Sequence, residues 1–473
     1  MGYHPGVEDD GIYLSAVKSD LNPALYPHDA RFVRSQVQAT IFDKGIAAFV
    51  RWTGISVADT ELLFQFASIL LIVFSCWSIA RLLFQQAWVQ WAGVALVTAM
   101  FTLPVAGTAL YLVDQHLHPR NMATALILLA VARILAGRHG QAVPLLLLAF
   151  LLHPIMGAMG LSFCVFLFLV LLEPGHAWLR RWRKSARPSL LAGFLPLGWI
   201  LEPPTPAWRA AAMTRTYLFL FQWTWYEWLG AVAPLVLFYL LWRMARKQGE
   251  TLLARFALAV LLYGVFQMAV AIVMLAPPAL IRLAPLQPMR FLQIVYFFMI
   301  LMGGCLLGKY LLKTHIWRWA LYLVVINASM FASQQMLFAS SEHLELPGRK
   351  PENAWLQAFA WIRHNTPTDA YFALDPRYLA APGEDYHSFR ALAERSQLAD
   401  AIKDTAVVTL VPDLGGVWER QENAQKGWSH FKLADFERLK AEFGVGWVVV
   451  SYPPPTGLLC EWHNRVVSVC RIP

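Results

Sequence analysis

Residues 252–275 read LLARFALAVLLYGVFQMAVAIVML, and Arg255 is the only charged side chain among them. A helix of this length can cross the roughly 30 Å hydrocarbon core of a bilayer. Similar apolar blocks recur along the 473 residues, of which 58% are hydrophobic and 15% charged. Soluble domains carry about 45 to 50% apolar residues. The sequence therefore predicts a polytopic, mainly α membrane protein whose helices close their own backbone hydrogen bonds within lipid.

The apolar blocks predict ten membrane helices in a transmembrane bundle that spans residues 60–337. We expect them at 61–84, 88–108, 121–137, 141–153, 155–173, 189–202, 227–244, 252–275, 291–309 and 316–336. The blocks at 141–153 and 189–202 are short for a full crossing. They indicate half-helices or a broken pair hinged at His153-Pro154.

The Lys and Arg residues predict the orientation of the bundle, because short cytoplasmic loops hold an excess of them. Alternate loops carry these cations: Arg180, Arg181, Arg183, Lys184 and Arg187, then Arg243, Arg246 and Lys247, then Lys309 and Lys313. We expect those loops inside and both ends of the chain outside, on the periplasmic side of a bacterial inner membrane. The net charge of +9 is then a topology signal and not a nucleic-acid patch.

The first 59 residues form an external loop in this scheme, yet no apolar segment precedes them to export it. We therefore expect a first helix before Gly2, which gives about eleven crossings in place of ten. Unaided translocation of an N-terminal tail is the alternative.

The tail, residues 338–473, has the pattern of a soluble α/β domain. Apolar residues at helical spacing predict helices at 352–364 and 433–443. Short β-like runs predict strands at 370–374, 406–411, 446–451 and 466–472. Cys460 and Cys470 flank a predicted hairpin turn, so a disulfide between them fits an oxidising compartment.

The N-terminal loop contains three consecutive acids, Glu8, Asp9 and Asp10. Adjacent carboxylates repel one another, so the pKa of at least one should rise unless a cation or metal neutralises the set. Such a carboxylate can act as a general base. The alternative is a structural role, in which the acids cap a helix that starts near Gly11.

A second polar group, Tyr111, Asp114, His116, His118 and Arg120, interrupts the apolar run after the second predicted helix. A cation beside a helix N-terminus, flanked by two histidines, is suited to bind an anion. The alternative is an interfacial loop whose polar groups meet water.

A third group, residues 279–293 (ALIRLAPLQPMRFLQ), places Arg282 and Arg290 at the external end of a helix, against the charge bias. Phosphate binding or pairing with the N-terminal acids would explain both arginines. The loop that holds Trp208, Trp223, Trp225, Tyr226 and Trp228 could stack on a sugar or anchor at the interface.

Together these features resemble the GT-C-fold glycosyltransferases that use lipid-linked sugars. The likeness lies in an external acidic loop, a bundle of membrane helices and an external C-terminal domain. More closely, the stretches GYHPGVEDDGIY (2–13) and LHPRN (117–121) resemble an uncharacterised family of bacterial integral membrane proteins related to that class.

The resemblance implies transfer of a sugar from a polyprenyl-phosphate-linked donor to an acceptor on the external face. Asp9 or Asp10, with Glu8, would form the catalytic group, and a divalent cation (Mg or Mn) held by Asp9 and Asp10 is one variant of the class. The cations Arg120, Arg282 and Arg290, with His116 and His118, would hold the lipid phosphate.

Two other function classes fit the sequence. A transporter would use the same arginines to bind an anion or lipid-linked substrate, but it should show paired inverted repeats, which the sequence does not display. A non-enzymatic assembly or scaffold protein would need only the soluble tail.

Overall fold

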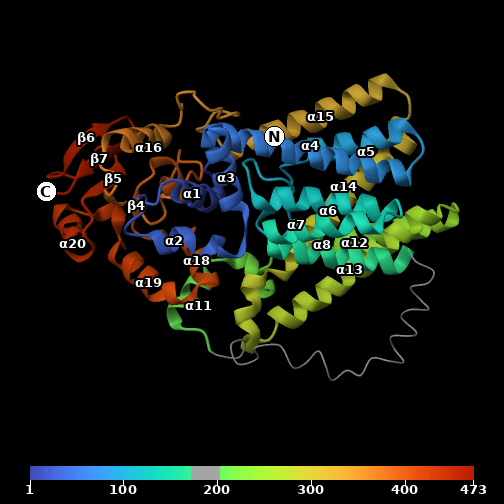
Figure 1. Ribbon diagram of the computed structural model, residues 1–473, viewed down its shortest axis with the longest axis horizontal. Helices are drawn as coiled ribbons and strands as arrows, with labels where there is room; N and C mark the ends of the chain where they lie inside the picture. The colour runs from blue at the N-terminus through green and yellow to red at the C-terminus, as the bar shows by residue number, and fades with distance from the viewer. Residues whose placement is uncertain (172–202) are drawn as a thin grey trace.

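The computed structural model describes residues 1–171 and 203–473, and it is mainly helical (Figure 1). Long helices lie side by side at one end of the molecule, and the C-terminal domain with its small sheet lies at the other. The N-terminal helices lie between them: α1 (Asp10–Leu21), α2 (Ala30–Arg34) and α3 (Phe42–Thr53). The helical end contains α4 (Val57–Leu83), α5 (Ala87–Ala99), α6 (Pro119–Leu135), α7 (His139–Leu152), α8 (Pro154–Leu171), α12 (Trp225–Lys247), α13 (Thr251–Leu275), α14 (Phe291–Leu307) and α15 (Ile316–Leu337).

Six described helical segments are long and apolar enough to cross a membrane, which indicates a membrane location. They are Val57–Leu83, Pro154–Leu171, Trp225–Lys247, Thr251–Leu275, Pro288–Leu312 and Ile316–Leu337. Ala87–Ala99 and His139–Leu152 are shorter apolar helices. The helix expected at 189–202 and the cations from Arg180 to Arg187 lie outside the described residues.

The bundle has a buried centre and an exposed rim. In the apolar stretch of Pro288–Leu312, 78% of the residues are buried, against 6% in Ile316–Leu337. The segment that contains α14 therefore runs through the middle of the bundle, while α15 presents apolar side chains outward. A membrane helix needs no aqueous face, so exposed residues such as Leu321 and Val324 suit contact with lipid.

The predicted helix at 88–108 is wrong in its second half. The helix α5 ends at Ala99, and two short strands follow, β1 (Pro104–Val105) and β2 (Leu110–Tyr111), which pair in antiparallel fashion. The sequence remains apolar past Ala99 because the loop after α5 buries side chains such as Phe101 and Val105 inside the protein. Hydrophobicity alone could not separate these two environments.

The short helix α7 forms a hairpin with α8. The two meet at His153, and the His139 ring at the start of α7 contacts Phe168 near the end of α8, with ring centroids 5.1 Å apart. A Cβ on Gly157 would lie 2.3 Å from the Phe150 Cα, so glycine is needed for this close approach. The break expected at His153-Pro154 is thus a reversal of chain direction.

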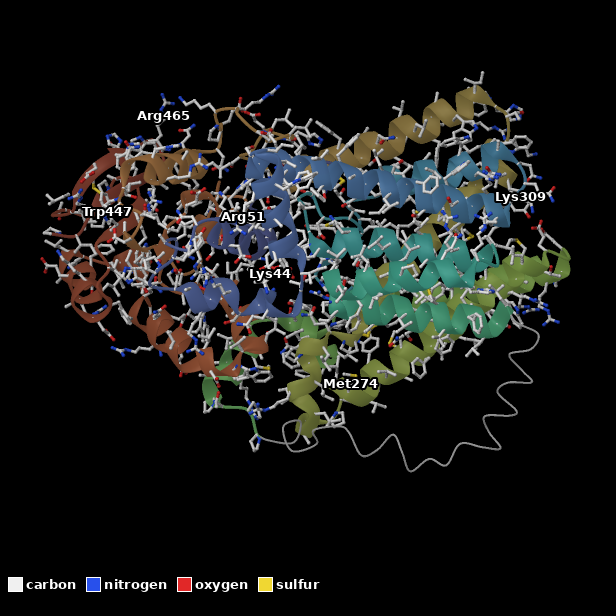
Figure 2. The ribbon with its side chains drawn as sticks, viewed as in Figure 1. Lys44, Arg51, Met274, Lys309, Trp447 and Arg465 are labelled. Atoms are coloured by element: carbon white, nitrogen blue, oxygen red, sulfur yellow. A yellow bond between two sulfur atoms is a disulfide. The ribbon has the colours of Figure 1, made fainter. Side chains whose placement is uncertain are left out.

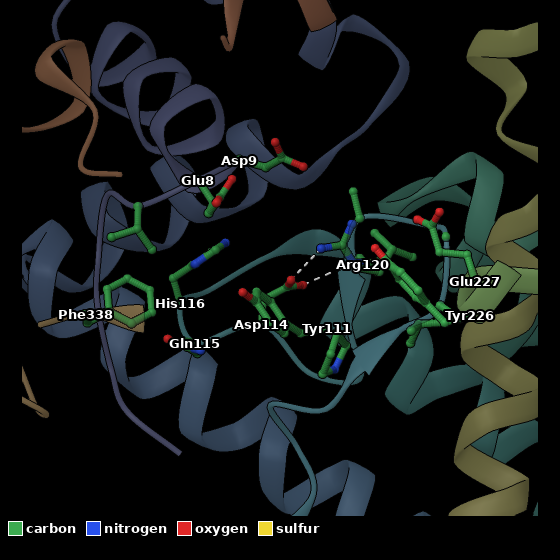
Figure 3. Close-up of a pocket in the computed structure, with 17 residues that line it drawn as sticks. Glu8, Asp9, Tyr111, Asp114, Gln115, His116, Arg120, Tyr226, Glu227 and Phe338 are labelled. Carbon is green, nitrogen blue, oxygen red and sulfur yellow. Dashed lines mark hydrogen bonds and ion pairs between the residues drawn. The ribbon is translucent and has the colours of Figure 1, made fainter. Parts of the chain in front are cut away.

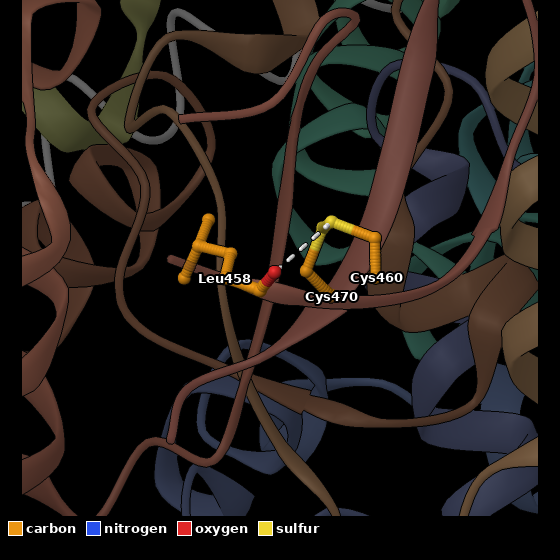
Figure 4. Close-up of a disulfide and its surroundings, with 3 residues drawn as sticks. All are labelled: Leu458, Cys460 and Cys470. Carbon is orange, nitrogen blue, oxygen red and sulfur yellow. Dashed lines mark hydrogen bonds between the residues drawn. A yellow bond between two sulfur atoms is a disulfide. The ribbon is translucent and has the colours of Figure 1, made fainter. Parts of the chain in front are cut away.

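The C-terminal domain packs helices around a five-stranded sheet of order β4-β3-β5-β7-β6. The parallel strands are β3 (Tyr371–Ala373), β4 (Ser396–Gln397) and β5 (Trp447–Ser451), while β7 (Val467–Arg471) runs antiparallel to both β5 and β6 (Leu459–His463). Its helices are α16 (Ala354–Asn365), α17 (Phe389–Ala393), α18 (Asp404–Leu410), α19 (Gly415–Ala424) and α20 (Leu433–Phe443). A disulfide joins Cys460 and Cys470, which face each other across the β6–β7 pair (Figure 4).

The strand predicted at 406–411 is wrong, because residues 406–410 lie in α18 and Val411 follows its last turn. The β-branched residues Val407 and Val408 favour a strand by propensity, but both are buried by packing of the helix. The helix α11 (Pro206–Met213) lies against α18, and the Trp208 indole donates to the Thr409 carbonyl oxygen at 3.1 Å.

The N-terminal segment is built into the C-terminal domain. Tyr3 pairs with Leu344 and Val7 with His387 as isolated β-bridges, and α1 lies against α17. A Cβ on Gly11 would lie 2.3 Å from the Ser388 Cβ, so the two helices approach closely. Residues at the two ends of the chain therefore form one layer at one end of the bundle, whereas Lys309 lies at the opposite end, far from Trp447 (Figure 2).

A buried histidine holds this layer together in a pH-dependent way. His387 Nδ1 lies 2.8 Å from the Glu384 carbonyl oxygen, and Nε2 lies 3.0 Å from Glu345 Oε2. Neither acceptor can donate a hydrogen, so the ring must carry both of its own and be cationic. Burial alone would lower the pKa of His387, but the Glu345 carboxylate outweighs burial and raises the pKa above its ordinary value.

We expect the stability contributed by His387 to be complete below about pH 6.5, the ordinary histidine value, and to be lost as pH rises through the raised pKa. The apparent melting temperature of the detergent-solubilised protein should therefore fall from mildly acidic to mildly alkaline pH. His387→Gln should flatten this dependence, whereas His463→Gln, at an exposed position, should leave it intact. An equally steep fall in His387→Gln would contradict the assignment.

Candidate functional site

A cavity of about 540 Å³ lies where the N-terminal segment, the β1–β2 loop and the first turns of α6 and α12 meet (Figure 3). Its polar lining consists of Glu8, Asp9, Tyr111, Asp114, Gln115, His116, Arg120, Tyr226 and Glu227. The cavity therefore brings together most of the first and second polar groups of the sequence, without Asp10 and His118, and it lies at the end of the bundle that faces the C-terminal domain.

The three consecutive acids do not share one environment. Glu8 and Asp9 line the cavity, whereas Asp10 is 1% exposed and its Oδ2 accepts a hydrogen bond from the Gly6 amide at 2.6 Å. Burial raises the pKa of Asp10 to about 7. Successive residues at a helix start point about 100° apart, which separates Asp9 from Asp10. Asp9 precedes the first turn of α1 but makes no side-chain capping hydrogen bond.

The C-terminal domain supplies a cation to these acids. Lys403 lies immediately before α18, and its Nζ lies 3.1 Å from Asp9 Oδ1 and also contacts Glu8 Oε2. Burial alone would raise the pKa of Asp9, but Lys403 and the nearby Arg120 and Arg215 outweigh it and hold the pKa well below the usual range. No local pattern predicts a role for Lys403, a single lysine in the C-terminal domain.

Arg120 is fixed by a buried ion pair with Asp114. Its Nε lies 3.1 Å from Asp114 Oδ2 and its Nη2 contacts Oδ1, while Nη1 is buried without a hydrogen-bond partner among the described residues. Pro119 opens α6 at a position that needs no amide donor. One guanidinium nitrogen is therefore available to an incoming anion.

The two histidines of the loop also have unused nitrogens. His118 Nδ1 accepts from the Arg120 amide at 2.9 Å, which places its hydrogen on Nε2, 3.9 Å from Asp9 Oδ2. Within the described part of the chain, neither nitrogen of His116 has a partner. Burial lowers the pKa of His116 to about 4, so the ring is neutral and can both donate and accept.

The third polar group is divided by the structure. Arg290 is 8% exposed at the start of α14, and its Nε is buried without a hydrogen-bond partner in residues 1–171 and 203–473. Burial raises the pKa of Tyr13 to about 12. The charges of Asp9, Arg290 and Arg120 all act on Tyr13, so Arg290 lies in the same polar region as Asp9 and Arg120. Arg282 donates to the Pro203 carbonyl oxygen at 3.0 Å, and neither Arg282 nor Arg290 is among the residues that line the cavity.

The aromatic residues expected to stack on a sugar have different positions. Tyr226 lines the cavity, next to Glu227, at the first turn of α12. Trp208 is buried against α18, and the Trp223 ring packs over Gly107. Of these aromatic residues, Tyr226 is the one that forms part of the cavity lining.

The metal site expected at Asp9 and Asp10 would require both carboxylates to converge. The hydrogen bond from Gly6 directs Asp10 away from the cavity. Among the described residues, no group of three or more His, Cys, Asp or Glu side chains has the geometry of a metal centre.

Comparison with models of known protein families finds no match for this sequence, and no curated protein matches it.

Proposed function

We propose that the chain is an integral membrane glycosyltransferase that transfers a sugar from a polyprenyl-phosphate-linked donor to an acceptor on the external face of the membrane. The main observation in support of this proposal is the cavity. It places the partly exposed Asp9 carboxylate opposite Arg120, whose Nη1 has no partner among the described residues, at the end of an apolar helix bundle. A lipid-linked donor has the matching parts, an apolar chain, an anionic phosphate and a sugar.

The charges suit the two demands of this reaction. The acceptor hydroxyl must lose a proton as it attacks the sugar, and the phosphate leaving group gains negative charge. We assign the proton to Asp9, because its carboxylate lines the cavity and lies within electrostatic reach of Arg120, the cation proposed to bind the phosphate. Arg120 and Arg290 would stabilise the phosphate, and the Tyr226 ring would pack on the sugar.

Asp9 has a low pKa in the substrate-free site, which makes it a weak base there. A bound phosphate would compete for Lys403, Arg120 and Arg215, the cations that now stabilise its charge. Donor binding should then raise the pKa of Asp9 and strengthen it as a base. Proton transfer would thus follow donor binding, which protects the donor from premature attack.

Arg290 provides a direct test, because a buried cation destabilises the fold when it has no partner, and Arg290 Nε has none among the described residues. We expect Arg290→Gln to keep or raise the apparent melting temperature and to weaken binding of undecaprenyl phosphate about tenfold or more, since each charged hydrogen bond contributes about 1.5 to 3 kcal/mol. Native mass spectrometry of nanodisc-embedded protein measures this binding. Undecaprenol, which lacks the phosphate, should not discriminate between the two proteins.

Arg282→Gln is the matched control, because Arg282 lies eight positions before Arg290 and its guanidinium donates to the Pro203 carbonyl oxygen. It should bind undecaprenyl phosphate as the wild type does. Equal binding of phosphate and alcohol by the wild type, or unchanged phosphate binding in Arg290→Gln, would contradict the proposed phosphate site.

A further inference from the structure

The segment of the C-terminal domain that carries Lys403 is held rigidly by buried charges. Asp400 Oδ1 accepts from the Ile402 amide at 2.8 Å, which fixes the turn before α18. Arg390 then clamps the start of α18 through two hydrogen bonds to the Asp404 carboxylate, at 2.8 and 2.9 Å. The position of the Lys403 backbone is therefore determined by its neighbours and does not depend on its own side chain.

Two other parts of the chain hold the same segment. Arg390 Nε also contacts Asp29 in the N-terminal segment, and Arg215 Nη2 donates to the Ile402 carbonyl oxygen at 3.0 Å. The N-terminal segment, the loop after α11 and the C-terminal domain thus converge on residues 400–404. Through Lys403, this segment contacts Glu8 and Asp9, which line the cavity.

Docking of the domain does not require Lys403. The network around Arg390 is buried, and Lys18 adds a second link through Glu394 at 2.7 Å and the Ala391 carbonyl oxygen. Lys403 is 12% exposed, and in the described residues its ammonium group contacts only Glu8 and Asp9.

We propose that Lys403 is a positioning residue of the catalytic site, through which the C-terminal domain holds the Asp9 carboxylate directed into the cavity. This inference rests on the proposed function, and it adds that the soluble domain is a working part of the site. A domain that moved away would take Lys403 with it and leave Asp9 without its nearest cation.

The charged and titratable groups around Asp9 come from several elements. They are Glu8 and Tyr13 in the N-terminal segment, Lys403 before α18, His116, His118 and Arg120 around the start of α6, Arg215 after α11, and Arg290 before α14. Lys403 is the closest cation to the Asp9 carboxylate in this set. An opposite charge at this distance lowers a carboxylate pKa by about 1 to 3 units. Replacing Lys403 by a neutral residue should therefore raise the pKa of Asp9 by about one unit or more.

Carbodiimide labelling tests this without an activity assay, because the reagent attacks protonated carboxyl groups. Full-length protein in nanodiscs is labelled from about pH 3 to about pH 8, and labelling of Asp9 is read by peptide mass spectrometry. The low pKa of Asp9 places the wild-type midpoint at or below the acidic end of this range. Lys403→Met should shift the midpoint upward by about one unit or more. Lys403→Arg, which retains the charge, should restore the wild-type midpoint.

Lys426→Met is the control, because Lys426 lies on the exposed surface of the same domain, 3.6 Å from Glu422. It should leave the Asp9 midpoint unchanged, and gel filtration should show all three variants folded. An unchanged midpoint in folded Lys403→Met overturns the role of Lys403, even if sugar transfer is found. A shifted midpoint in a protein whose wild type transfers no sugar supports the contact between Lys403 and Asp9, but overturns catalysis at Asp9 and with it the positioning role.

Discussion

Arg390→Met is expected to lower the stability of the protein by about 3 to 5 kcal/mol, the usual result of removing one partner from a buried ion network. Arg390 is 7% exposed and contacts Asp29, Asp404 and Asp400, which are themselves 5% exposed or less. Methionine fills much of the same volume but leaves these carboxylates buried without their cation. The excess negative charge must then be hydrated or protonated, and either event opens the junction between the two ends of the chain.

The apparent melting temperature of the detergent-solubilised protein measures this effect, and a fall of roughly 10 °C is expected, since about 1 kcal/mol shifts a domain by 2 to 4 °C. Limited proteolysis should also cut between the C-terminal domain and α15. Arg420→Met is the control, because Arg420 is 66% exposed in its pair with Glu442, and exposed pairs contribute little. Equal melting temperatures for Arg390→Met and Arg420→Met would show that the network does not hold the junction.

Much of the helical bundle could be predicted from apolar length. The block 252–275 corresponds to Thr251–Leu275, and the predicted helix 433–443 has the same bounds as α20. Both helices are specified by their local sequence. The first is apolar over its whole length, and α20 has one apolar face and ends before Gly444. The error at 100–108 arose because apolar residues buried in a loop look like apolar residues that face lipid. The error at 406–411 arose because β-branched residues buried by helix packing look like a strand.

The site could be predicted only in part, because its geometry depends on long-range docking. Asp114, His116 and Arg120 follow from polar residues that interrupt an apolar run, and Glu8 and Asp9 follow from three consecutive acids in the N-terminal loop. All five line the cavity. The side chains of Asp9 and Asp10 point in different directions because Asp10 accepts a hydrogen bond from the Gly6 amide. The cation that contacts Asp9 is Lys403, which lies 394 positions further along the chain. Neither fact has a local signal in the sequence.

Asp9→Asn is expected to reduce sugar transfer about 10²- to 10⁴-fold, the contribution typical of a general base. Asparagine has nearly the same shape and keeps one oxygen toward Lys403, but it cannot take up the acceptor proton. Asp10→Asn should retain at least a tenth of the activity. Its carboxylate accepts from the Gly6 amide, and the asparagine carbonyl oxygen can accept the same hydrogen bond. Burial already raises the pKa of Asp10 to about 7, so the neutral side chain is tolerated there.

The most direct measurement compares these two variants in membrane vesicles from bacterial cells that express the chain and contain natural polyprenyl-phosphate-linked sugars. Mass spectrometry follows the sugar donors and the free polyprenyl phosphate that transfer releases. The account predicts rapid release by the wild type and Asp10→Asn, and none above background by Asp9→Asn. Equal release by Asp9→Asn and the wild type, or release by none of the three folded proteins, would contradict it.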